Sequence, residues 1–263
     1  MTHPMFSQEE ADTYACLRPH TVKAKDTIFG KIYIHLEDGL VSFHQRWRYH
    51  FILDQTFGKH AAKASPWTDD EERDFHYAAE SIIWKFWNSR RTLPGSSDPT
   101  TQQFIDLINK HSGISFSVSG DGEFAQKFAG RQLPIEFDAL ITQKRPHFNV
   151  NVKKMLPGRE LALRSNVDWG SLTINVAKND TDRSPAQQVG KGAARTDDFY
   201  TLPHEFGHAI GYGVDEYEVG ATARKDIDSL MNIGKEIRPR HLAFIKAQLN
   251  TMLKGVKFHL PPN

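Results

Sequence analysis

The sequence predicts an α+β fold with a mixed sheet, because strand patterns lie on both sides of a long amphipathic helix. Two β-like stretches come first, at residues 27–36 and 41–51. A helical apolar period then covers residues 68–89, and alternating apolar side chains return at 148–152 and 172–176. The middle third is therefore strand-rich and follows a helix, which favours the α+β class.

The first two strand patterns are separated by a turn signal. Residues 27–36 alternate partly between apolar and polar side chains, and residues 41–51 are rich in aromatic side chains. Between them lie Glu37, Asp38 and Gly39, a composition that favours a tight turn. We therefore predict a β-hairpin at this position.

The helix over residues 68–89 is predicted by both its first turn and its apolar stripe. Thr68 and Glu71 have capping-box spacing, and Asp69 and Asp70 add acidic side chains to the first turn. Apolar residues follow at helical spacing: Phe75, Ala78, Ala79, Ile82, Ile83, Phe86 and Trp87. Such a stripe is typical of a core-facing helix, and we assign it no chemistry.

Less regular segments separate these elements. Residues 93–99 have the composition of a loop, a short helix is expected at 104–108, and a strand is expected at 114–118. Residues 184–195 have no apolar period and contain two glycines. We expect them to form a surface loop that helps to shape a cleft.

Length, charge and cysteine content limit the class of protein. The 263 residues suffice for a single domain, in which we expect a β-rich N-terminal extension at 1–64 and a core at 65–263. Lys and Arg number 33 against 32 Asp and Glu, a balance that disfavours a nucleic-acid binder. No apolar run approaches the roughly 20 residues of a membrane span. The single Cys16 excludes an internal disulfide, and we expect no Sec signal peptide because the first residues lack its basic and apolar regions.

Residues 204–208 carry the strongest chemical pattern, His-Glu-Phe-Gly-His. On a helix, His204 and His208 project from one face, so both imidazoles can reach a single cation. Glu205 can approach a metal-bound water without being a ligand, which makes it the candidate general base. Zinc suits imidazole ligands and activates water, so the pattern predicts a hydrolase with one Zn²⁺ per chain.

The surrounding residues fit a helix over residues 199–211 that is followed by a tight turn. Pro203 lies in the first helical turn, and Gly211 stands where a helix needs a left-handed terminator. Further along, residues 228–234 have the composition of a tight turn, with Met231 in the middle.

These motifs together resemble the zincin metallopeptidases. H-E-x-x-H-x-x-G at residues 204–211 and Ser-Leu-Met at 229–231 are similar to the metzincin branch with its Met-turn. Asp-Glu-Tyr at 215–217 resembles an extension in several bacterial metallopeptidase groups, and residues 231–241 resemble metallopeptidase domains of bacterial type VI secretion effectors. The resemblance covers about residues 199–245. It implies a zincin-like core with an active-site helix, a C-terminal helix and a peptide or protein substrate.

The third metal ligand is open at this point. In the metzincin pattern it falls on Val214, whose side chain cannot bind zinc. Asp215 comes one residue later and ranks first, Glu216 ranks second, and Glu236 beyond the Met-turn ranks third. A carboxylate at Asp215 or Glu216 could instead hold the turn or orient a ligand histidine.

Further contacts with a substrate are predicted outside the motif. His241, at the start of an expected terminal helix, is the first candidate to donate a hydrogen bond to a developing oxyanion, ahead of Tyr212 and Tyr217. A capping or surface role for His241 is the alternative. Residues 172–178 are expected to form an edge strand with which a peptide pairs. The terminal helix would pack on the core through Leu242, Ile245, Leu249 and Leu253.

Two other functions compete with peptide hydrolysis. One is a zinc-dependent amidase that acts on cell-wall peptides, and the other is a non-catalytic binding module stabilised by zinc. Structural zinc sites usually have four protein ligands and favour cysteine, so the single cysteine disfavours the module. From the resemblance alone, we expect a toxin made in the bacterial cytoplasm and secreted into a target cell without a Sec signal peptide. An immunity protein or a secretion-spike component would be its partner.

Overall fold

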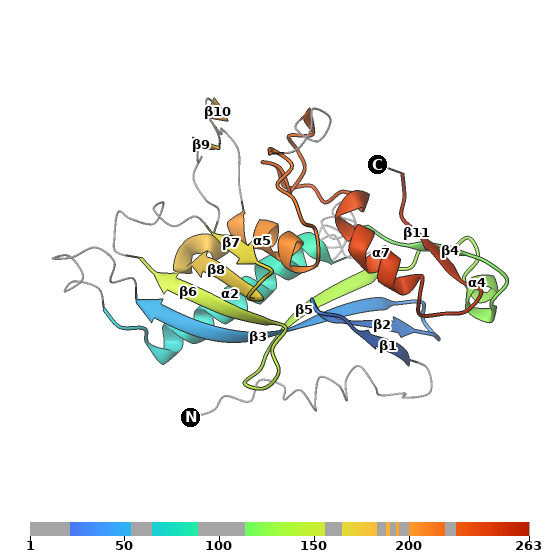
Figure 1. Ribbon diagram of the computed structural model, residues 1–263, viewed down its shortest axis with the longest axis horizontal. Helices are drawn as coiled ribbons and strands as arrows, with labels where there is room; N and C mark the ends of the chain where they lie inside the picture. The colour runs from blue at the N-terminus through green and yellow to red at the C-terminus, as the bar shows by residue number, and fades with distance from the viewer. Residues whose placement is uncertain are drawn as a thin grey trace, which may run out of the picture.

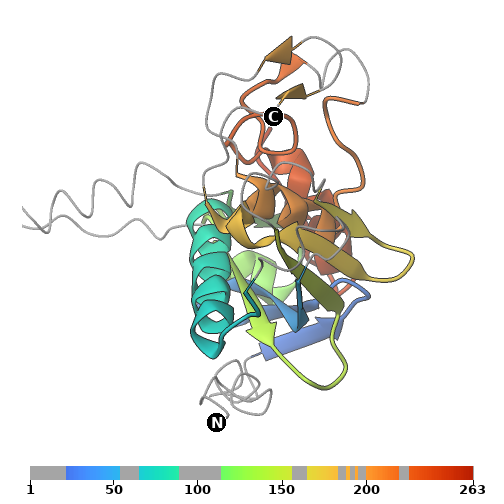
Figure 2. The same ribbon diagram turned by 90° about the vertical axis from the view of Figure 1, so that its left-hand side faces the viewer.

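The protein has a mixed α+β architecture with few helices, in which helices pack against a mixed sheet (Figures 1 and 2). The computed structural model describes residues 22–53, 65–88, 114–155, 165–182, 188–189, 193–194, 200–218 and 225–262. Cys16, the predicted loop at 93–99, the predicted helix at 104–108 and most of the predicted loop at 184–195 lie outside the described residues.

The main sheet has seven described strands of mixed direction. They are β1 (Val22–Asp26), β2 (Lys31–His35), β3 (Val41–Leu53), β5 (Ile135–Ile141), β6 (Phe148–Lys154), β7 (Asn166–Asp168) and β8 (Thr173–Ala177). Their order is β1-β2-β3-β6-β8-β7, and β5 also pairs with β3. The pairs β3/β5, β3/β6 and β6/β8 are parallel, whereas β1/β2, β2/β3 and β7/β8 are antiparallel.

Strand β3 is the central strand of this sheet. The predicted hairpin is confirmed, because β2 and β3 pair antiparallel around the Glu37–Gly39 turn. The same β3 pairs with β5 through residues 41–47 and with β6 through residues 47–53. The described strands of the predicted N-terminal extension, β1 to β3, therefore belong to the same sheet as β5 to β8.

The alternating pattern at 172–176 forms strand β8, as predicted, but this strand does not lie at the edge of the sheet. Ile174 and Val176 are fully buried, as the pattern requires. However, β7 pairs with β8 on the side away from β6, with Val167 opposite Ile174. Among the described strands the sheet therefore ends at β7, and the prediction of an edge strand at 172–178 is wrong.

Helix α2 (Asp69–Trp87) agrees with its sequence prediction. Thr68 is the N-cap, and the capping box with Glu71 is complete. Its buried side chains, Phe75, His76, Ala79, Ile83 and Trp87, join the core above the sheet. The indole Nε1–H of Trp87 also donates to the carbonyl oxygen of Pro203 at 2.9 Å. The helix thus ties the strand layer to helix α5 (Thr201–Ala209).

The C-terminal segment closes the same core. A 3₁₀ helix η5 (Pro239–Leu242) leads into α7 (Ala243–Leu249), so the predicted terminal helix is confirmed, but it ends before Leu253. Strand β11 (Lys257–His259) then pairs with β4 (Ser117–Ser119), so the strand predicted at 114–118 is present but begins only at Ser117. The other described elements are α4 (Glu123–Lys127), η4 (Lys178–Thr181), β9 (Gln188–Val189) and β10 (Ala193–Ala194).

Candidate metal site

Helix α5 carries the two motif histidines on one face. His204 is buried and His208 is partly buried, and their ring centroids lie 4.9 Å apart. Each ring is oriented by a backbone carbonyl. His204 Nδ1 lies 2.8 Å from the oxygen of Leu230, and His208 Nδ1 lies 2.7 Å from the oxygen of Tyr212. Gly211, with φ of +104°, ends the helix and turns the chain back toward the histidines.

Asp215 is the carboxylate that the structure brings to these histidines. Its Oδ1 lies 2.8 Å from His204 Nε2 and 3.1 Å from His208 Nε2, and the two Nε2 atoms are 3.2 Å apart. Burial opposes ionisation of Asp215, but hydrogen bonds with His204 and His208 hold the pKa of its carboxyl well below the usual range. Asp215 is therefore an anion at neutral pH.

The chemistry of this group fits a cation. Because a carbonyl oxygen only accepts, each histidine carries a hydrogen on Nδ1, and a neutral ring then presents a bare Nε2 lone pair. Two such lone pairs and a carboxylate oxygen converge here, and they repel one another unless extra protons or a cation lie among them. His204, His208 and Asp215 can therefore hold a metal ion, since their ligand atoms all lie within 4.8 Å of one another.

Glu205 lies next to this group and has an unused carboxylate oxygen. The residue is 6% exposed, and its Oε2 is buried without a hydrogen-bond partner in the described part of the chain. Burial raises the pKa of the Glu205 carboxyl, and the neighbouring His204 and His208 offset this only in part. A buried carboxylate oxygen without a partner is costly. Its presence beside three side chains that could hold a metal ion makes Glu205 a candidate for chemistry rather than for packing.

Helix α5 is held at both ends by buried polar side chains. At its start, Asp180 accepts hydrogen bonds from Thr201 and from the backbone of Ala177. At its end, Gln45 from the central strand donates to the carbonyl oxygen of Ala209 at 2.8 Å. Neither contact is predicted by the sequence. Gln45 and Ala209 are 164 residues apart, and no local pattern marks either Asp180 or Gln45 as a partner of this helix.

The predicted Met-turn lies directly beneath the histidine helix. Met231 is fully buried, and its sulfur packs against Gly207 so closely that a Cβ on Gly207 would overlap it. The backbone of the turn also bonds to residues of the site. The carbonyl oxygen of Leu230 accepts a hydrogen bond from the His204 ring, and the carbonyl oxygen of Met231 accepts one from the backbone N–H of Glu216 at 2.9 Å. The turn therefore orients one histidine and the segment that carries Asp215.

Gly207→Ala should destabilise the protein, although alanine is normally the better helix former by about 1 kcal/mol. The added methyl group would meet Met231 Sδ, and we expect a loss of about 1–3 kcal/mol, as in other overpacked cores. Urea unfolding of the metal-free protein measures this loss. The loss should shrink in the Met231→Ala background, and an equal loss in both backgrounds would contradict the contact.

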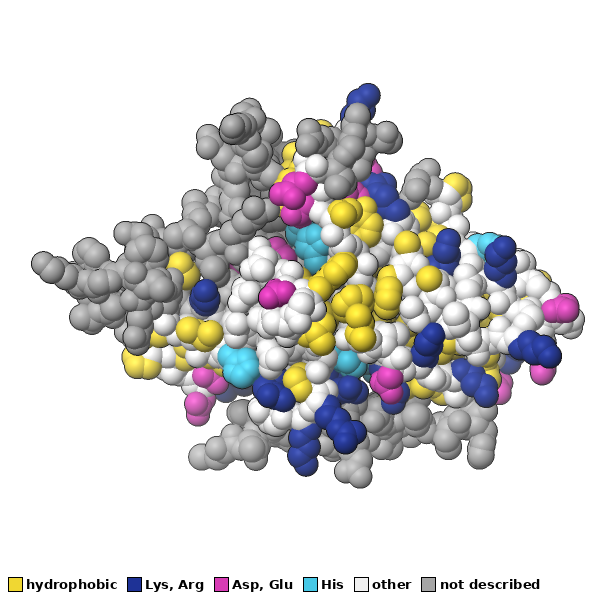
Figure 3. Space-filling view, viewed as in Figure 1, with side chains coloured by type: hydrophobic (Ala, Val, Ile, Leu, Met, Phe, Trp, Pro, Cys, Tyr) yellow, Lys and Arg dark blue, Asp and Glu magenta, His cyan; other side chains and the backbone are white. Residues whose placement is uncertain are grey.

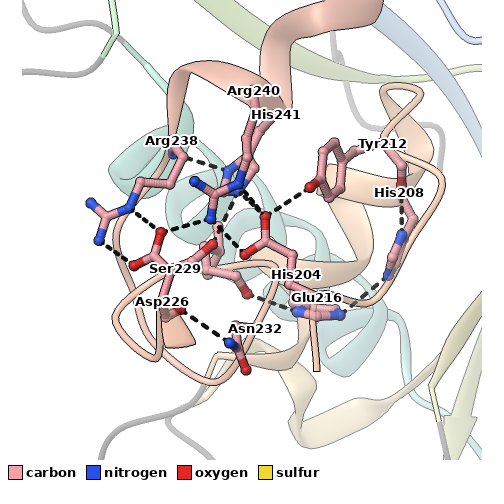
Figure 4. A network of polar contacts seen from close by, with 11 residues as sticks. His204, His208, Tyr212, Glu216, Asp226, Ser229, Asn232, Arg238, Arg240 and His241 are labelled. Atoms are coloured by element: carbon pink, nitrogen blue, oxygen red, sulfur yellow. Dashed lines mark hydrogen bonds and ion pairs between the residues drawn. The ribbon is translucent and has the colours of Figure 1, made fainter. Parts of the chain in front are cut away.

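The other predicted carboxylates belong to an ion-pair network beside the metal group (Figure 4). Glu216 is fully buried and forms a bidentate pair with Arg240, at 2.6 and 2.8 Å. Arg240 also binds Asp226 at 2.6 Å, and Arg238 joins Asp226 to Glu236. Glu216 and Glu236, the second and third candidates for the metal ligand, thus bind arginines instead. The network holds Glu216 in place and thereby restrains Asp215, the residue directly before it in the chain.

The structure places His241 in a capping role, which is the alternative to the oxyanion donor. The residue is 1% exposed, and its Nδ1 accepts from the backbone N–H of Arg238. Nε2 therefore carries the hydrogen, and it lies 3.1 Å from Ser229 Oγ and 3.2 Å from Glu216 Oε1. Both ring nitrogens are engaged inside the core, so His241 supports Glu216 and has no N–H left for an oxyanion.

The two tyrosines also have partners in this region. The hydroxyl of Tyr212 donates to Glu216 Oε1 at 2.7 Å and so belongs to the same network. Tyr217 lies nearer the metal group, because its ring stacks on His204 and its side chain bonds to Asp215. The side chain of Tyr217 thus contacts His204 and Asp215, whereas the side chains of Tyr212 and His241 bind Glu216.

Asp226→Asn should show how the network depends on pH. Hydrogen bonds from Arg238 and Arg240 lower the pKa of Asp226 from its ordinary value of 3.8 to about 2. A lowered pKa contributes stability above the ordinary value, and that stability disappears as the pH falls through the folded value. Wild type should therefore unfold at higher urea than the variant at pH 7. The difference between the two urea midpoints should disappear between about pH 4 and 2. A difference that does not change with pH would contradict the ion pairs.

Comparisons of the chain with protein-family models, with curated proteins and with solved structures find no match in any of the three. Within the described residues, no helix is long and apolar enough to cross a membrane.

Proposed function

We propose that the chain is a zincin-type metallopeptidase that holds one Zn²⁺ through His204, His208 and Asp215. The observation that best supports this proposal is that Glu205 Oε2, which has no hydrogen-bond partner in the described chain, lies beside the converging ligand atoms of these three residues. Three protein ligands are typical of catalytic zinc sites, which keep a position for water or substrate. When bound there, zinc would supply the Lewis acidity that lowers the pKa of a coordinated water toward about 7.

Glu205 would provide the proton transfer. Its unpartnered Oε2 is the atom that would take a proton from the attacking water, and the same oxygen would return it to the leaving amine nitrogen. The backbone carbonyls of Leu230 and Tyr212 would hold the two imidazoles so that each Nε2 faces the metal. The hydroxyl of Tyr217 bonds to Asp215 and would help to orient that carboxylate toward the metal.

The peptide would lie along β7, since this strand ends the described sheet and contacts helix α5. An extended chain can pair with a strand edge through main-chain hydrogen bonds, which suits a peptide substrate. This contact replaces the predicted pairing with residues 172–178.

Incubation of the zinc-loaded full chain with casein and with peptidoglycan tests the proposal. We expect cleavage of casein that a chelator abolishes and that added zinc restores. Release of cell-wall peptides without casein cleavage would replace the peptidase by an amidase. Tight zinc binding without hydrolysis of either substrate would replace it by a metal-stabilised binding module.

A further inference from the structure

An exposed apolar surface lies beside the metal group, on the side of His208. It consists of Trp169, Gly213 and Val214, which we call the apolar shelf. Trp169 is 38% exposed and Val214 is 41% exposed, although both are large apolar residues. Figure 3 shows hydrophobic side chains gathered beside a histidine near the middle of this face. Val214 directly precedes Asp215, so the shelf adjoins a metal-ligating residue.

The indole of Trp169 is fixed at this position. Its Nε1–H donates to the carbonyl oxygen of His208 at 3.1 Å, and its ring lies so close to Gly213 that a side chain there would overlap it. Underneath, the ring packs on Phe29 with a centroid distance of 5.3 Å, and Phe29 packs in turn on Phe244. The exposed part of the indole is therefore the top of an aromatic cluster and not a freely rotating side chain.

The turn that carries Trp169 is held by its own hydrogen bonds. Asp168 Oδ1 accepts from the backbone of Gly170 at 2.8 Å, and its Oδ2 accepts from Ser171 Oγ at 2.8 Å. These bonds lower the pKa of the Asp168 carboxyl and keep it anionic. Leu172 completes the turn with φ of +50°. A rigid aromatic surface loses little conformational entropy when a ligand covers it.

We propose that the apolar shelf binds a large apolar side chain of the substrate next to the bond that is cut. The inference rests on the proposed peptidase function and names its specificity. Burial of the exposed indole releases the most free energy when an aromatic or branched aliphatic side chain covers it. An acidic side chain is disfavoured, because it would lose hydration on an apolar surface and because the anionic Asp168 directly precedes Trp169.

Peptide sets that differ only at one residue beside the cleaved bond test this specificity. We expect the zinc-loaded full chain to cleave the Phe or Leu peptide with kcat/KM at least about tenfold above the Ala peptide and still further above the Glu peptide. Trp169→Ala should cut this preference to within about threefold, whereas Trp169→Phe should keep most of it. Trp84→Ala, an exposed tryptophan on α2, is the matched control and should keep the preference.

Binding to the Glu205→Gln protein provides a readout that does not depend on turnover. Calorimetry should give the same order of peptide affinities, and Trp169→Ala in this background should flatten it. An equal loss for all peptides, with or without loss of zinc, would make Trp169 a mere support of His208 and overturn the proposal. Absence of any preference in the wild type would also overturn it. A wild type that cleaves no peptide, by contrast, refutes the peptidase function itself.

Discussion

Glu205→Gln should retain about one zinc per chain and lower kcat/KM for casein-derived peptides at least ~100-fold, the low end for removal of a general base. Gln keeps the shape of the side chain but cannot take a proton. The carboxylate oxygen that it replaces is buried and has no partner in the described chain, so no other hydrogen bond is broken. Metal content and hydrolysis are measured on the same preparation.

The matched control for this variant is Glu123→Gln, which changes an exposed glutamate on α4 in the same way. It should keep both zinc and activity. If Glu205→Gln stays within a few fold of wild type, Glu205 is not the proton acceptor. If instead zinc is lost together with activity, Glu205 helps to hold the metal and its proposed role must be revised.

Asp215→Ala should weaken zinc binding by more than ~100-fold, because it removes a direct ligand. Mutation of a residue that only hydrogen-bonds to a ligand already lowers metal affinity by about 10–100-fold. The Oδ1 of Asp215 lies within 3.1 Å of the Nε2 atoms of both His204 and His208. Competition with a zinc chelator of known affinity measures the change. Activity at limiting zinc should fall in parallel.

Two other carboxylates provide the comparison for Asp215. Glu236→Ala truncates an exposed carboxylate that binds Arg238, and it should leave zinc affinity near that of wild type. Glu216→Ala should lower zinc affinity less than Asp215→Ala does, and should mainly reduce stability, because it leaves Arg240 without its bidentate partner. If Asp215→Ala binds zinc as wild type does, the third ligand is another group.

The sequence predicts best what is encoded locally. The capping box at Thr68, the turn after His35 and the one-turn spacing of His204 and His208 all depend on residues close together in the chain, and all are present. Gly211 likewise marks the end of its helix by itself. The class of the fold and the two histidines of the site follow from such signals.

What the sequence could not predict depends on contacts between distant segments. Strand β5 was missed, and the central place of β3 follows from parallel pairing with strands about 100 residues later. Asp215 lies beside the two histidines while Arg240 pairs with Glu216, and the sequence does not show this pairing between residues 24 positions apart. The sequence likewise left two roles open for His241, because its position does not show that both ring nitrogens face the core.

The nature of the metal site can be measured by X-ray absorption at the zinc edge of the zinc-loaded protein, together with its metal content. We expect one zinc per chain, bound by two imidazole nitrogens at about 2.0–2.1 Å, one carboxylate oxygen and at least one solvent oxygen. A protein that takes up no metal, or whose zinc is surrounded by four protein ligands, would contradict the hydrolase proposed for this chain.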